Sequence, residues 1–575
     1  MNPVIDPRGG DVEDDASSTK RRSLLSLAGS LLAEISLPKL VLSWTMLFVV
    51  PGLLLGLAPL VASAWVSLVS RKVTSPLLGI WPALLLLAVL AIGLFGVRSL
   101  FRMAESSFWS LNSLAVEPIY VACREGLRHF VEKLLQSRLS GSQLATLRAG
   151  TAGVAGIIIF AVALAVLAAC WPSSRWLGNF ADLASPHDLV SVALANSIVL
   201  VAAYLAVAAL VWAFADATMP QLRDFGGFPA DAYADQTWRI AHLSDIHVVG
   251  ERYGFRIESG RAGPRGNERL HRLLALLDVI HANNPLDTIL VTGDMTDAGR
   301  SAEWSELLDA LMAYPQLAER ILILPGNHDL NIVDRANPAR LDLPTSPNRK
   351  LRRLRFLSAV DALHGERVRL IDQTARCLAG SLSEALKPHR TEMAKFAEVG
   401  RPRLSTNLNE LWAAVFPMVL PPDRDDGLGI ILLDSNADTH FSFTNALGMI
   451  SVEQVRGIEI AAAQYPQACW IIALHHHVIE YPKVAKVLSE RIGTALVNGN
   501  WFVRRLRTLG GRAVLMHGHR HIDWIGKCAG LVIVSAPSPV MEATDGVSTY
   551  FYIHTVARTG AQFGLLTPER VVVDG

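Results

Sequence analysis

The sequence predicts an α-helical membrane domain of four transmembrane helices followed by an α/β domain. Only 18% of the residues are charged and 51% are hydrophobic, whereas a soluble protein carries about 25% charged residues. The uninterrupted apolar sequence is concentrated in the first 216 residues. From about residue 236, short apolar runs alternate with helical stretches, which is typical of an α/β fold. At 575 residues the chain is also too long for one compact domain.

Residues 1–38 are mostly polar, with acidic residues at 13–15 and the basic run at 20–22. We expect a disordered or amphipathic tail in this region. A cleavable signal peptide is not expected, because the first long apolar stretch begins too far from the start of the chain.

Four windows within the predicted transmembrane region 39–216 contain no Asp, Glu, Lys or Arg: residues 40–70, 73–97, 149–174 and 189–215. Each exceeds the roughly 20 residues that a helix needs to cross a bilayer. Pro51 and Pro59 either kink the first span or divide it into a re-entrant pair. Transport proteins usually need ionisable groups inside their spans, so uncharged spans favour an anchor over a transporter.

The bias of lysine and arginine predicts the orientation of these spans. Residues 1–39 and the loop 98–148 are rich in Lys and Arg, whereas Arg175 is the only one between the third and fourth windows. The positive-inside rule therefore places the N-terminus, the loop 98–148 and the C-terminal domain in the cytoplasm, on a multi-pass protein of the inner membrane. Residues 117–136 have helical apolar spacing and form either an amphipathic helix, on the membrane or against the C-terminal domain, or a solvated linker helix.

The net charge and the spacing of the cysteines do not indicate nucleic-acid binding, a disulfide framework or a cysteine zinc site. The net charge of +1 does not favour nucleic-acid binding. The five cysteines are far apart and form no CxxC pair, so we expect free thiols in a reducing compartment.

Polar motifs follow the apolar runs of the second half, which are residues 239–243, 288–291, 321–324, 470–474 and 513–516. A further run at 430–433 ends at Asp434. The residues that follow the first five runs are Asp245 and His247, Asp294, Asn327 and His328, His475, and His519 and His521. Because strand carboxyl ends converge on one crevice in open α/β sheets, we expect these side chains to form one site.

Carboxylate, imidazole and amide oxygen are ligands for metals of intermediate softness. Asp245 and His247 can reach one ion, and Asp294 can bridge two ions with its two oxygens. Asn327 adds a neutral oxygen, and His475, His519 and His521 complete the two shells. Of the three consecutive histidines, His475 is the predicted ligand because it comes first after its strand, with His476 as the alternative.

Two metal ions in such a site can activate a water to attack phosphorus in line and can neutralise the developing charge. His328 could protonate the leaving oxygen or bind a phosphoryl oxygen, and we expect Asp329 to orient His328. Asp297 is expected to support the site by hydrogen bonding rather than to bind metal.

Residues 330–427 contain no ligand motif and are interpreted as an insertion that forms helices near the site. Its basic cluster consists of Arg349, Lys350, Arg352, Arg353 and Arg355. The cluster could steer an anionic substrate or touch anionic headgroups. The alternative, which we favour at this point, is a solvated helix face.

The motifs D-x-H, GD-x-x-D, GNH-D, H and GH-x-H over residues 245–521 resemble those of the calcineurin-like metallophosphoesterase superfamily, in its bacterial branch related to cyclic-nucleotide phosphodiesterases. The resemblance implies a four-layer αββα sandwich over residues 236–575 with two Mn, Fe or Zn ions. It implies that Asp245, His247, Asp294 and His521 hold one metal and that Asp294, Asn327, His475 and His519 hold the other. His328 would be the catalytic histidine.

The expected function is a membrane-anchored di-metal phosphoesterase that cuts a phosphodiester or a pyrophosphate bond. A nucleotide and a lipid-linked phosphate ester are both candidate substrates, and the lipid bilayer is the expected partner. The alternatives are a phosphomonoesterase and a membrane signalling or scaffold protein whose metal site only binds a ligand. The intact ligand set favours an enzyme.

Overall fold

The computed structural model describes residues 3–11, 13, 41–74 except 43, 117–135, 141–179, 182 and 186–220, and the range 222–574 with short gaps. These gaps are residues 229–234, 252–253, 258–262, 335–336, 338–339, 343–346, 401–405, 440–441, 482–493, 495, 542–545 and 561. The chain divides into two compact units, one of residues 36–219 and the other of residues 1–35 together with 220–575.

The unit of residues 36–219 is helical. It contains α3 (Val50–Thr74), which follows the π-helical turn η2 (Thr45–Val49), and α5 (Glu117–Leu135), α6 (Gly141–Cys170), η4 (Trp171–Ser173) and α7 (Pro186–Ala217). Three stretches are long and apolar enough to cross a membrane: Val50–Ser67, Gln143–Ser173 and His187–Ala217. They coincide with the first, third and fourth predicted spans. The second predicted span, 73–97, lies outside the described residues apart from its first two, which end α3.

The first span is one helix, because α3 continues through Pro59; the re-entrant alternative is therefore wrong for this stretch. The predicted helix over 117–136 is confirmed as α5. Two of its acidic side chains are buried and two of its large apolar side chains are not: Glu125 and Glu132 are each 1% exposed, whereas Phe130 and Leu134 are 67% and 71% exposed. This orientation is opposite to that of a solvated linker helix, so that alternative is also wrong.

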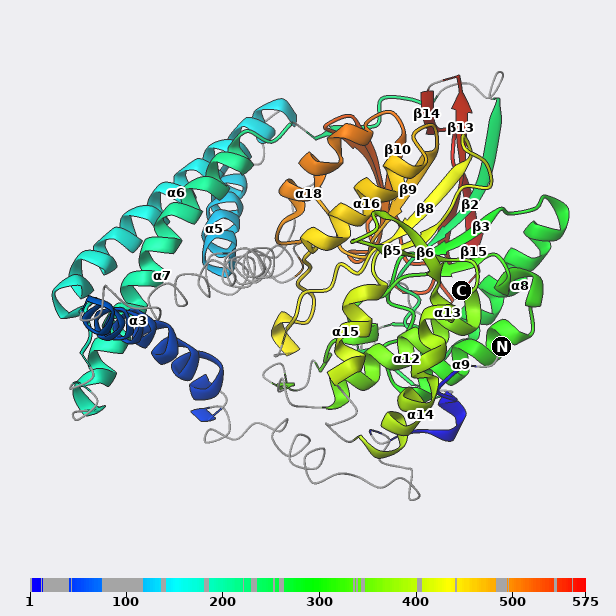
Figure 1. Cartoon of the computed structure of the whole chain (residues 1–575). Coiled ribbons are helices and arrows are strands. Elements are labelled where there is room, and N and C mark those ends of the chain that lie inside the picture. The colour runs from blue at the N-terminus through cyan, green and yellow to red at the C-terminus, as the bar shows by residue number, and fades with distance from the viewer. Residues whose placement is uncertain are drawn as a thin grey trace. The chain divides into compact units, whose positions relative to one another are not determined.

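The unit of residues 1–35 and 220–575 contains the predicted phosphoesterase motifs and is called the catalytic unit below. It has two mixed β-sheets whose inner faces share one hydrophobic core (Figure 1). The six-stranded sheet has the order β14-β13-β2-β3-β4, with β15 beside β13. Its strands are β2 (Gln236–Leu243), β3 (Thr288–Val291), β4 (Ile321–Ile323), β13 (Thr549–Thr559), β14 (Gln562–Leu565) and β15 (Glu569–Val573). β2, β3 and β4 are parallel, and β13 runs antiparallel to β2.

The nine-stranded sheet has the order β1-β11-β12-β10-β9-β8-β7-β5-β6. Its strands are β1 (Arg223–Asp224), β5 (Arg369–Asp372), β6 (Cys377–Ser381), β7 (Met418–Leu420), β8 (Leu428–Leu432), β9 (Cys469–Ala473), β10 (Ala513–His517), β11 (Trp524–Cys528) and β12 (Leu531–Ser535). The central strands β8, β9, β10 and β12 are parallel. They are buried along their length and read as continuous runs of β-branched and large apolar residues, as expected for strands covered on both faces.

Helices cover the outer faces of the two sheets (Figure 1). On the side of the nine-stranded sheet lie α16 (Val452–Gln464) and α18 (Gly499–Leu506). On the other side lie α8 (Glu268–Asn283), α9 (Ser301–Met312) and α12 (Pro347–His364), with the short helices α10 (Pro315–Ala318) and α11 (Asn327–Leu330) beside them. The predicted α/β sandwich is thus confirmed.

The insertion 330–427 forms helices, as predicted, but also three strands. Besides α12 it contains α13 (Leu382–Leu386), α14 (Arg390–Val399) and α15 (Thr406–Val415), but it also supplies β5, β6 and β7, which extend one edge of the nine-stranded sheet. Its basic cluster is not a solvated face. Arg352 and Arg355 are each only 4% exposed, and Arg349 and Arg353 both pair with Asp438.

The predicted disordered tail is wrong for the residues that the structure describes there. Residues 3–11 and 13 pack on the catalytic unit, where Ile5 joins the hydrophobic core and Asp11 is fully buried. The backbone N–H of Ile5 donates to Ser358 Oγ on α12 at 2.7 Å. The polar composition of the segment, which predicted disorder, instead matches buried arginines on the catalytic unit.

Candidate metal centre

The candidate ligands come from five strand ends that meet where the two sheets face each other. β2 leads to Asp245 and His247, β3 to Asp294, and β4 to Asn327. On the other sheet β9 leads to His475, and β10 leads to His519 and His521. Because the strands within each set are parallel, their carboxyl ends lie at the same edge. The structure brings all seven predicted ligands together in one place.

The backbone is sharply turned at most of these positions. Asp245, His247, Asp294, His519 and His521 have positive φ values between 49° and 75°, a conformation that non-glycine residues rarely adopt. Gly293, at φ 94°, precedes Asp294, and a Cβ there would lie 2.5 Å from His475 Nδ1. Backbone strain of this kind is concentrated at functional sites, where the surrounding structure enforces it.

The first ligand group is centred on His247. Its Nε2 lies 3.7 Å from Asp294 Oδ2 and 4.0 Å from Asp245 Oδ1, and Asp245 Oδ1 lies 3.3 Å from His521 Nε2. Ligand atoms of Asp245, His247 and His521 all fall within 4.8 Å of one another. All four side chains are nearly or fully buried, so a cation there would be screened little by water.

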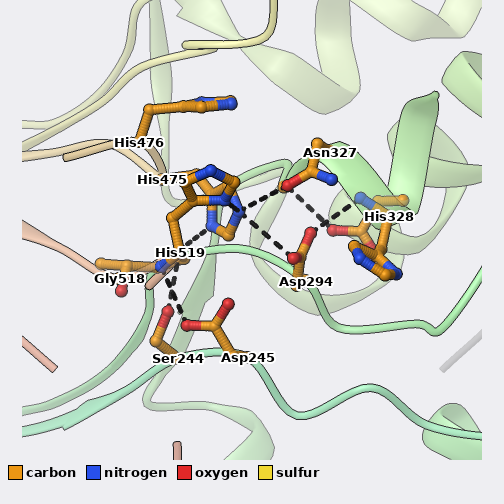
Figure 2. A network of polar contacts seen from close by, with 12 residues as sticks. Ser244, Asp245, Asp294, Asn327, His328, His475, His476, Gly518 and His519 are labelled. Carbon is orange, nitrogen blue, oxygen red and sulfur yellow. Dashed lines mark hydrogen bonds and ion pairs between the residues drawn. The ribbon is translucent and has the colours of Figure 1, made fainter. Parts of the chain in front are cut away.

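The second group is centred on His475 (Figure 2). His475 Nε2 lies 3.0 Å from Asn327 Oδ1, 3.2 Å from Asp294 Oδ2 and 3.0 Å from His519 Nδ1. On the other side of the ring, His475 Nδ1 donates to the carbonyl of Thr292 at 2.8 Å, which leaves Nε2 as the ligand nitrogen. Asp294 Oδ2 therefore belongs to both groups, as a shared carboxylate requires.

Several ligand atoms in this cluster have no hydrogen-bond partner among the described residues, although they are buried. They are Asp245 Oδ1, both ring nitrogens of His247, and His519 Nε2. A buried polar atom without a partner costs roughly 1–3 kcal/mol. A cation held by the first group would satisfy Asp245 Oδ1 and His247 Nε2, which face each other. His247 Nδ1 faces the Asp297 carboxylate instead. The donor set of carboxylates, imidazoles and one amide oxygen fits two ions of the Mn, Fe or Zn type.

The carboxylates and imidazoles of the cluster shift one another's pKa values. Burial opposes the charged form of Asp245, but His521 outweighs it and lowers the pKa of Asp245 to about 2. Burial also lowers the pKa of His475, but the Asp294 carboxylate overcomes this effect and raises that pKa to about 9. A metal ion that binds at this position must therefore displace a proton from His475.

His476 does not lie among the ligand atoms. Its Nδ1 is 2.8 Å from Ser435 Oγ, and the Gly448 backbone packs against its ring. The geometry thus favours His475, the first choice from the sequence, over His476. A side chain at Gly448 would collide with the His476 ring, since a Cβ there would lie 2.5 Å from His476 Cγ.

The prediction that Asp329 orients His328 is wrong. His328 Nδ1 instead donates to the backbone carbonyl of Asp297 at 2.7 Å. The Asp329 carboxylate points the other way and accepts from the N–H groups of Gly326 and Thr296, each at 2.9 Å, and from Thr296 Oγ1 at 2.7 Å. Asp329 therefore fastens the loop after β3 to the start of α11. Neighbouring residues on a helical turn do not face the same way.

Asp297 supports the site, as the sequence predicts. Its carboxylate accepts from the N–H of Ile257 at 2.8 Å and lies 3.6 Å from His247 Nδ1. We expect Asp297→Asn to weaken binding at the His247 metal by 10–100-fold, in the range that loss of a supporting carboxylate typically causes. Titration of the metal-free protein with Mn²⁺ would measure this, and unchanged affinity would contradict the role.

Glu303, at the start of α9, gives the loop after Asp297 a pH-dependent stability. It is 2% exposed, and its carboxylate accepts from the N–H groups of Ala298 and Arg300. Burial raises the pKa of Glu303 from 4.5 to about 7. The folded state thus holds this proton more tightly than the unfolded state, and the stability that it provides is lost as the pH rises from 4.5 through 7.

We therefore expect Glu303→Gln to change the pH profile of stability. Between pH 4.5 and pH 8 the free energy of unfolding should shift in favour of the variant by about 3 kcal/mol relative to wild type. Denaturant unfolding at the two pH values measures this shift, and parallel profiles for the two proteins would contradict it.

Sequence reasoning missed the backbone acceptors of the site. The carbonyls of Thr292 and Asp297 fix the rings of His475 and His328, but every residue has a carbonyl, so no residue type signals this role. It also missed the support by Arg352 and Arg355, whose side chains contact the loops that carry the site.

Comparison with known proteins agrees with this geometry. Residues 239–478 match the family model of the calcineurin-like phosphoesterases, a range that includes every candidate ligand except His519 and His521. This part of the chain is thus a calcineurin-like phosphoesterase domain, the domain of a metal-dependent phosphoester hydrolase. A search of curated proteins found no match.

Two solved structures are similar to part of the chain. One is a dimetal phosphatase from Danio rerio, with 12% identity, a TM-score of 0.33, and coverage of 59% of this chain and 98% of that chain. The other is a protein from Staphylococcus aureus assigned as a 5′-nucleotidase, with 11% identity, a TM-score of 0.28, and coverage of 59% of this chain and 55% of that chain.

Proposed function

We propose that this protein is a membrane-anchored di-metal phosphoesterase that hydrolyses a phosphodiester or pyrophosphate bond. The observation that carries the proposal is the position of Asp294 Oδ2, which lies within 3.7 Å of His247 Nε2 and 3.2 Å of His475 Nε2 and so belongs to both ligand groups. Two ions bound there would supply an activated water and neutralise charge on the phosphoryl group.

The residues of the chain would divide the remaining work. Asp245, His247, Asp294 and His521 would hold one ion, and Asp294, Asn327, His475 and His519 the other. His328 lies beside the first group, with its ring 4.4 Å from that of His247. Because the Nδ1–H of His328 donates to the carbonyl of Asp297, Nε2 is the nitrogen that, in the imidazolium form, would protonate the leaving oxygen as the P–O bond breaks.

Two further observations support placing this domain at a membrane. Three described helices are long and apolar enough to cross one. The helix α5 joins the ends of α6 and α7 by buried polar contacts, from Glu132 to Arg148 and from Tyr120 to Asp216. Its side chains Ile119, Phe130 and Leu134 are exposed. An outward apolar face suits a helix in contact with lipid.

The N-terminal contact supports a particular topology. Residues 3–11 and 13 pack on the same unit as the described residues after 220, so both must lie on one side of the membrane. The chain between them must then cross an even number of times. The predicted span over residues 73–97, together with the three described helices, would give four crossings. The lysine and arginine bias places that side in the cytoplasm. Reporter fusions after residue 575 test this, and an external reporter would overturn it.

The activity is tested with the full chain in detergent, loaded with Mn²⁺. Bis(4-nitrophenyl) phosphate is compared with 4-nitrophenyl phosphate and with a nucleoside diphosphate ester. We expect metal-dependent turnover that is faster on the diester or the pyrophosphate bond than on the monoester. A faster monoester rate would make the protein a phosphomonoesterase. Two bound metals without turnover on any of these esters would favour the binding-only scaffold.

The substrate of the proposed reaction is either a soluble nucleotide or a lipid-linked phosphate ester. A nucleotide and a lipid-linked phosphate ester present the same phosphoryl group to the metals. Comparing a water-soluble nucleotide diester with a phospholipid-derived diester in vesicles separates them, because only the second needs the membrane-bound form of the enzyme.

A further inference from the structure

The described N-terminal residues contact the catalytic unit through two buried arginines of α12. The Asp11 carboxylate pairs with Arg355 and accepts from Ser301 Oγ at 2.9 Å. The Glu13 carboxylate lies 2.7 Å from Arg355 Nη1 and 3.3 Å from Arg352 Nη1. These contacts join positions more than 330 residues apart in the sequence.

The same two arginines hold the loops that carry the catalytic machinery. Arg355 Nη1 donates to the carbonyl of Gly299 at 2.8 Å, and Arg352 Nε donates to the carbonyl of Leu330 at 2.8 Å. Gly299 lies two residues after Asp297, whose carbonyl orients His328. Leu330 ends α11, the short helix that begins with Asn327 and His328.

The two loops touch each other at Gly299. A Cβ on this residue would lie 2.4 Å from the carbonyl oxygen of Asp329 and 3.1 Å from Arg352 Cδ, and its φ is +66°. A shift of the Gly299 loop therefore moves α11 or opens a gap beside it. Since cores are closely packed, such a displacement passes to the next contact, here the Asp297 carbonyl and the His328 ring.

The carboxylates of Asp11 and Glu13 balance the buried positive charge of Arg355. Arg352 also pairs with Asp342, but the acidic partners of Arg355 in the described structure are Asp11 and Glu13. Arg355 is 4% exposed. Removing one partner from a buried pair is strongly destabilising, because a buried charge is left uncompensated. Without the N-terminal carboxylates, Arg355 would have to leave its place beside Gly299 to reach water.

We propose that Asp11 and Glu13, through Arg355 and Arg352, are positioning residues for the phosphoesterase reaction, and that the segment before the membrane region completes the active site by fixing His328. The inference rests on the proposed function. It also gives the basic cluster of the insertion a role: Arg352 and Arg355 hold the loops around the site rather than attract a substrate.

The test uses the full chain in detergent and the paired variant Asp11→Asn/Arg355→Met, which removes the buried charge together with its buried partner, while Glu13 keeps its contact with Arg352. The matched control is Arg8→Gln, which breaks an exposed contact of the same segment with Asp309. Rates are measured on methyl 4-nitrophenyl phosphate and on methyl phenyl phosphate, normalised to bound metal and to folded protein. Hydrogen exchange is measured in parallel.

We expect kcat of the paired variant to fall on the order of tenfold with KM little changed, the size of effect typical of a supporting residue. The loss should be larger for the phenyl ester, because a poorer leaving group needs the proton of His328 more. Exchange should increase at residues 296–301 and 326–331. The control should match wild type in all three measurements.

Equal loss on both esters, or wild-type kcat together with unchanged exchange in these loops, would overturn the inference and leave the contact a purely structural one. Hydrogen exchange decides the question even without turnover. If wild type binds two metals but hydrolyses neither these diesters nor a pyrophosphate bond, the proposed function fails, while local exchange still shows whether the N-terminal residues hold the His328 loops.

Discussion

Replacing Asp294 with asparagine is expected to reduce metal-dependent hydrolysis by about 1000-fold and to lower the metal content from two ions to one or none. In the wild type, Asp294 Oδ1 accepts a hydrogen bond from the backbone N–H of His328 at 2.8 Å. Asparagine has nearly the same volume and keeps an oxygen that can accept this bond. It removes the charge and replaces Oδ2, the oxygen near His247 and His475. Two ions supply several kcal/mol of transition-state stabilisation, and about 1.4 kcal/mol corresponds to tenfold in rate.

The measurement combines metal analysis of the purified variant with steady-state kinetics on the preferred ester. Asp434→Asn is the matched control. Asp434 is also a buried carboxylate after a strand, but it accepts from Trp412 Nε1 at 3.0 Å and belongs to neither ligand group. We expect this control to keep both metals. An Asp294→Asn protein with two metals and near wild-type turnover would rule out the shared carboxylate.

The ligand set could be predicted from the sequence because its members follow strands of simple pattern. The run 288–291 coincides with β3, and the runs 470–474 and 513–516 overlap β9 and β10 to within one residue. The ends of parallel strands must lie at one edge of a sheet. Once the strand ends were placed, the residue types after them indicated metal binding. Pairing two sheets face to face then brought His475 and His519 to Asp294, which the order of motifs alone does not show.

Contacts that depend on side-chain direction or on distant segments could not be predicted in this way. Asp329 follows His328 in the sequence, yet on the turn of α11 the two side chains diverge, and a backbone carbonyl orients the histidine instead. Asp11 lies in a polar stretch with the composition of a disordered tail. Only the buried position of Arg355, on a helix that looks solvated in sequence, reveals what Asp11 pairs with.

For helix α5 the sequence predicts the element but not which of its faces is buried. Its spacing correctly predicted an amphipathic helix, but periodicity does not say which face is buried. In a soluble setting the apolar face would pack inward. Here Glu125 and Glu132 are buried against neighbouring helices, and Phe130 and Leu134 face outward. The surrounding medium, which a sequence pattern does not contain, decides between the two orientations.

Replacing His328 with alanine is expected to leave both metals bound and to lower turnover by about 100- to 10,000-fold on esters with poor leaving groups, the range typical for loss of a general acid. The ring is 5% exposed and is fixed at Nδ1 by the Asp297 carbonyl, so its Nε2 can present a proton in one direction. A 4-nitrophenolate leaves without protonation at neutral pH, and its ester should lose much less. The measurement is a plot of log kcat/KM against leaving-group pKa for wild type and variant.

The slope of that plot separates the two roles of His328 that the sequence leaves open. If His328 donates a proton to the leaving oxygen, the variant plot is steeper, because charge on the departing oxygen is no longer neutralised. If His328 only binds a non-bridging phosphoryl oxygen, every ester loses the same factor and the two plots are parallel. Unchanged rates throughout would exclude both roles. Asn331→Ala is the control at the same helix end, since its side chain bonds the carbonyl of Asn445 and lies outside the ligand groups.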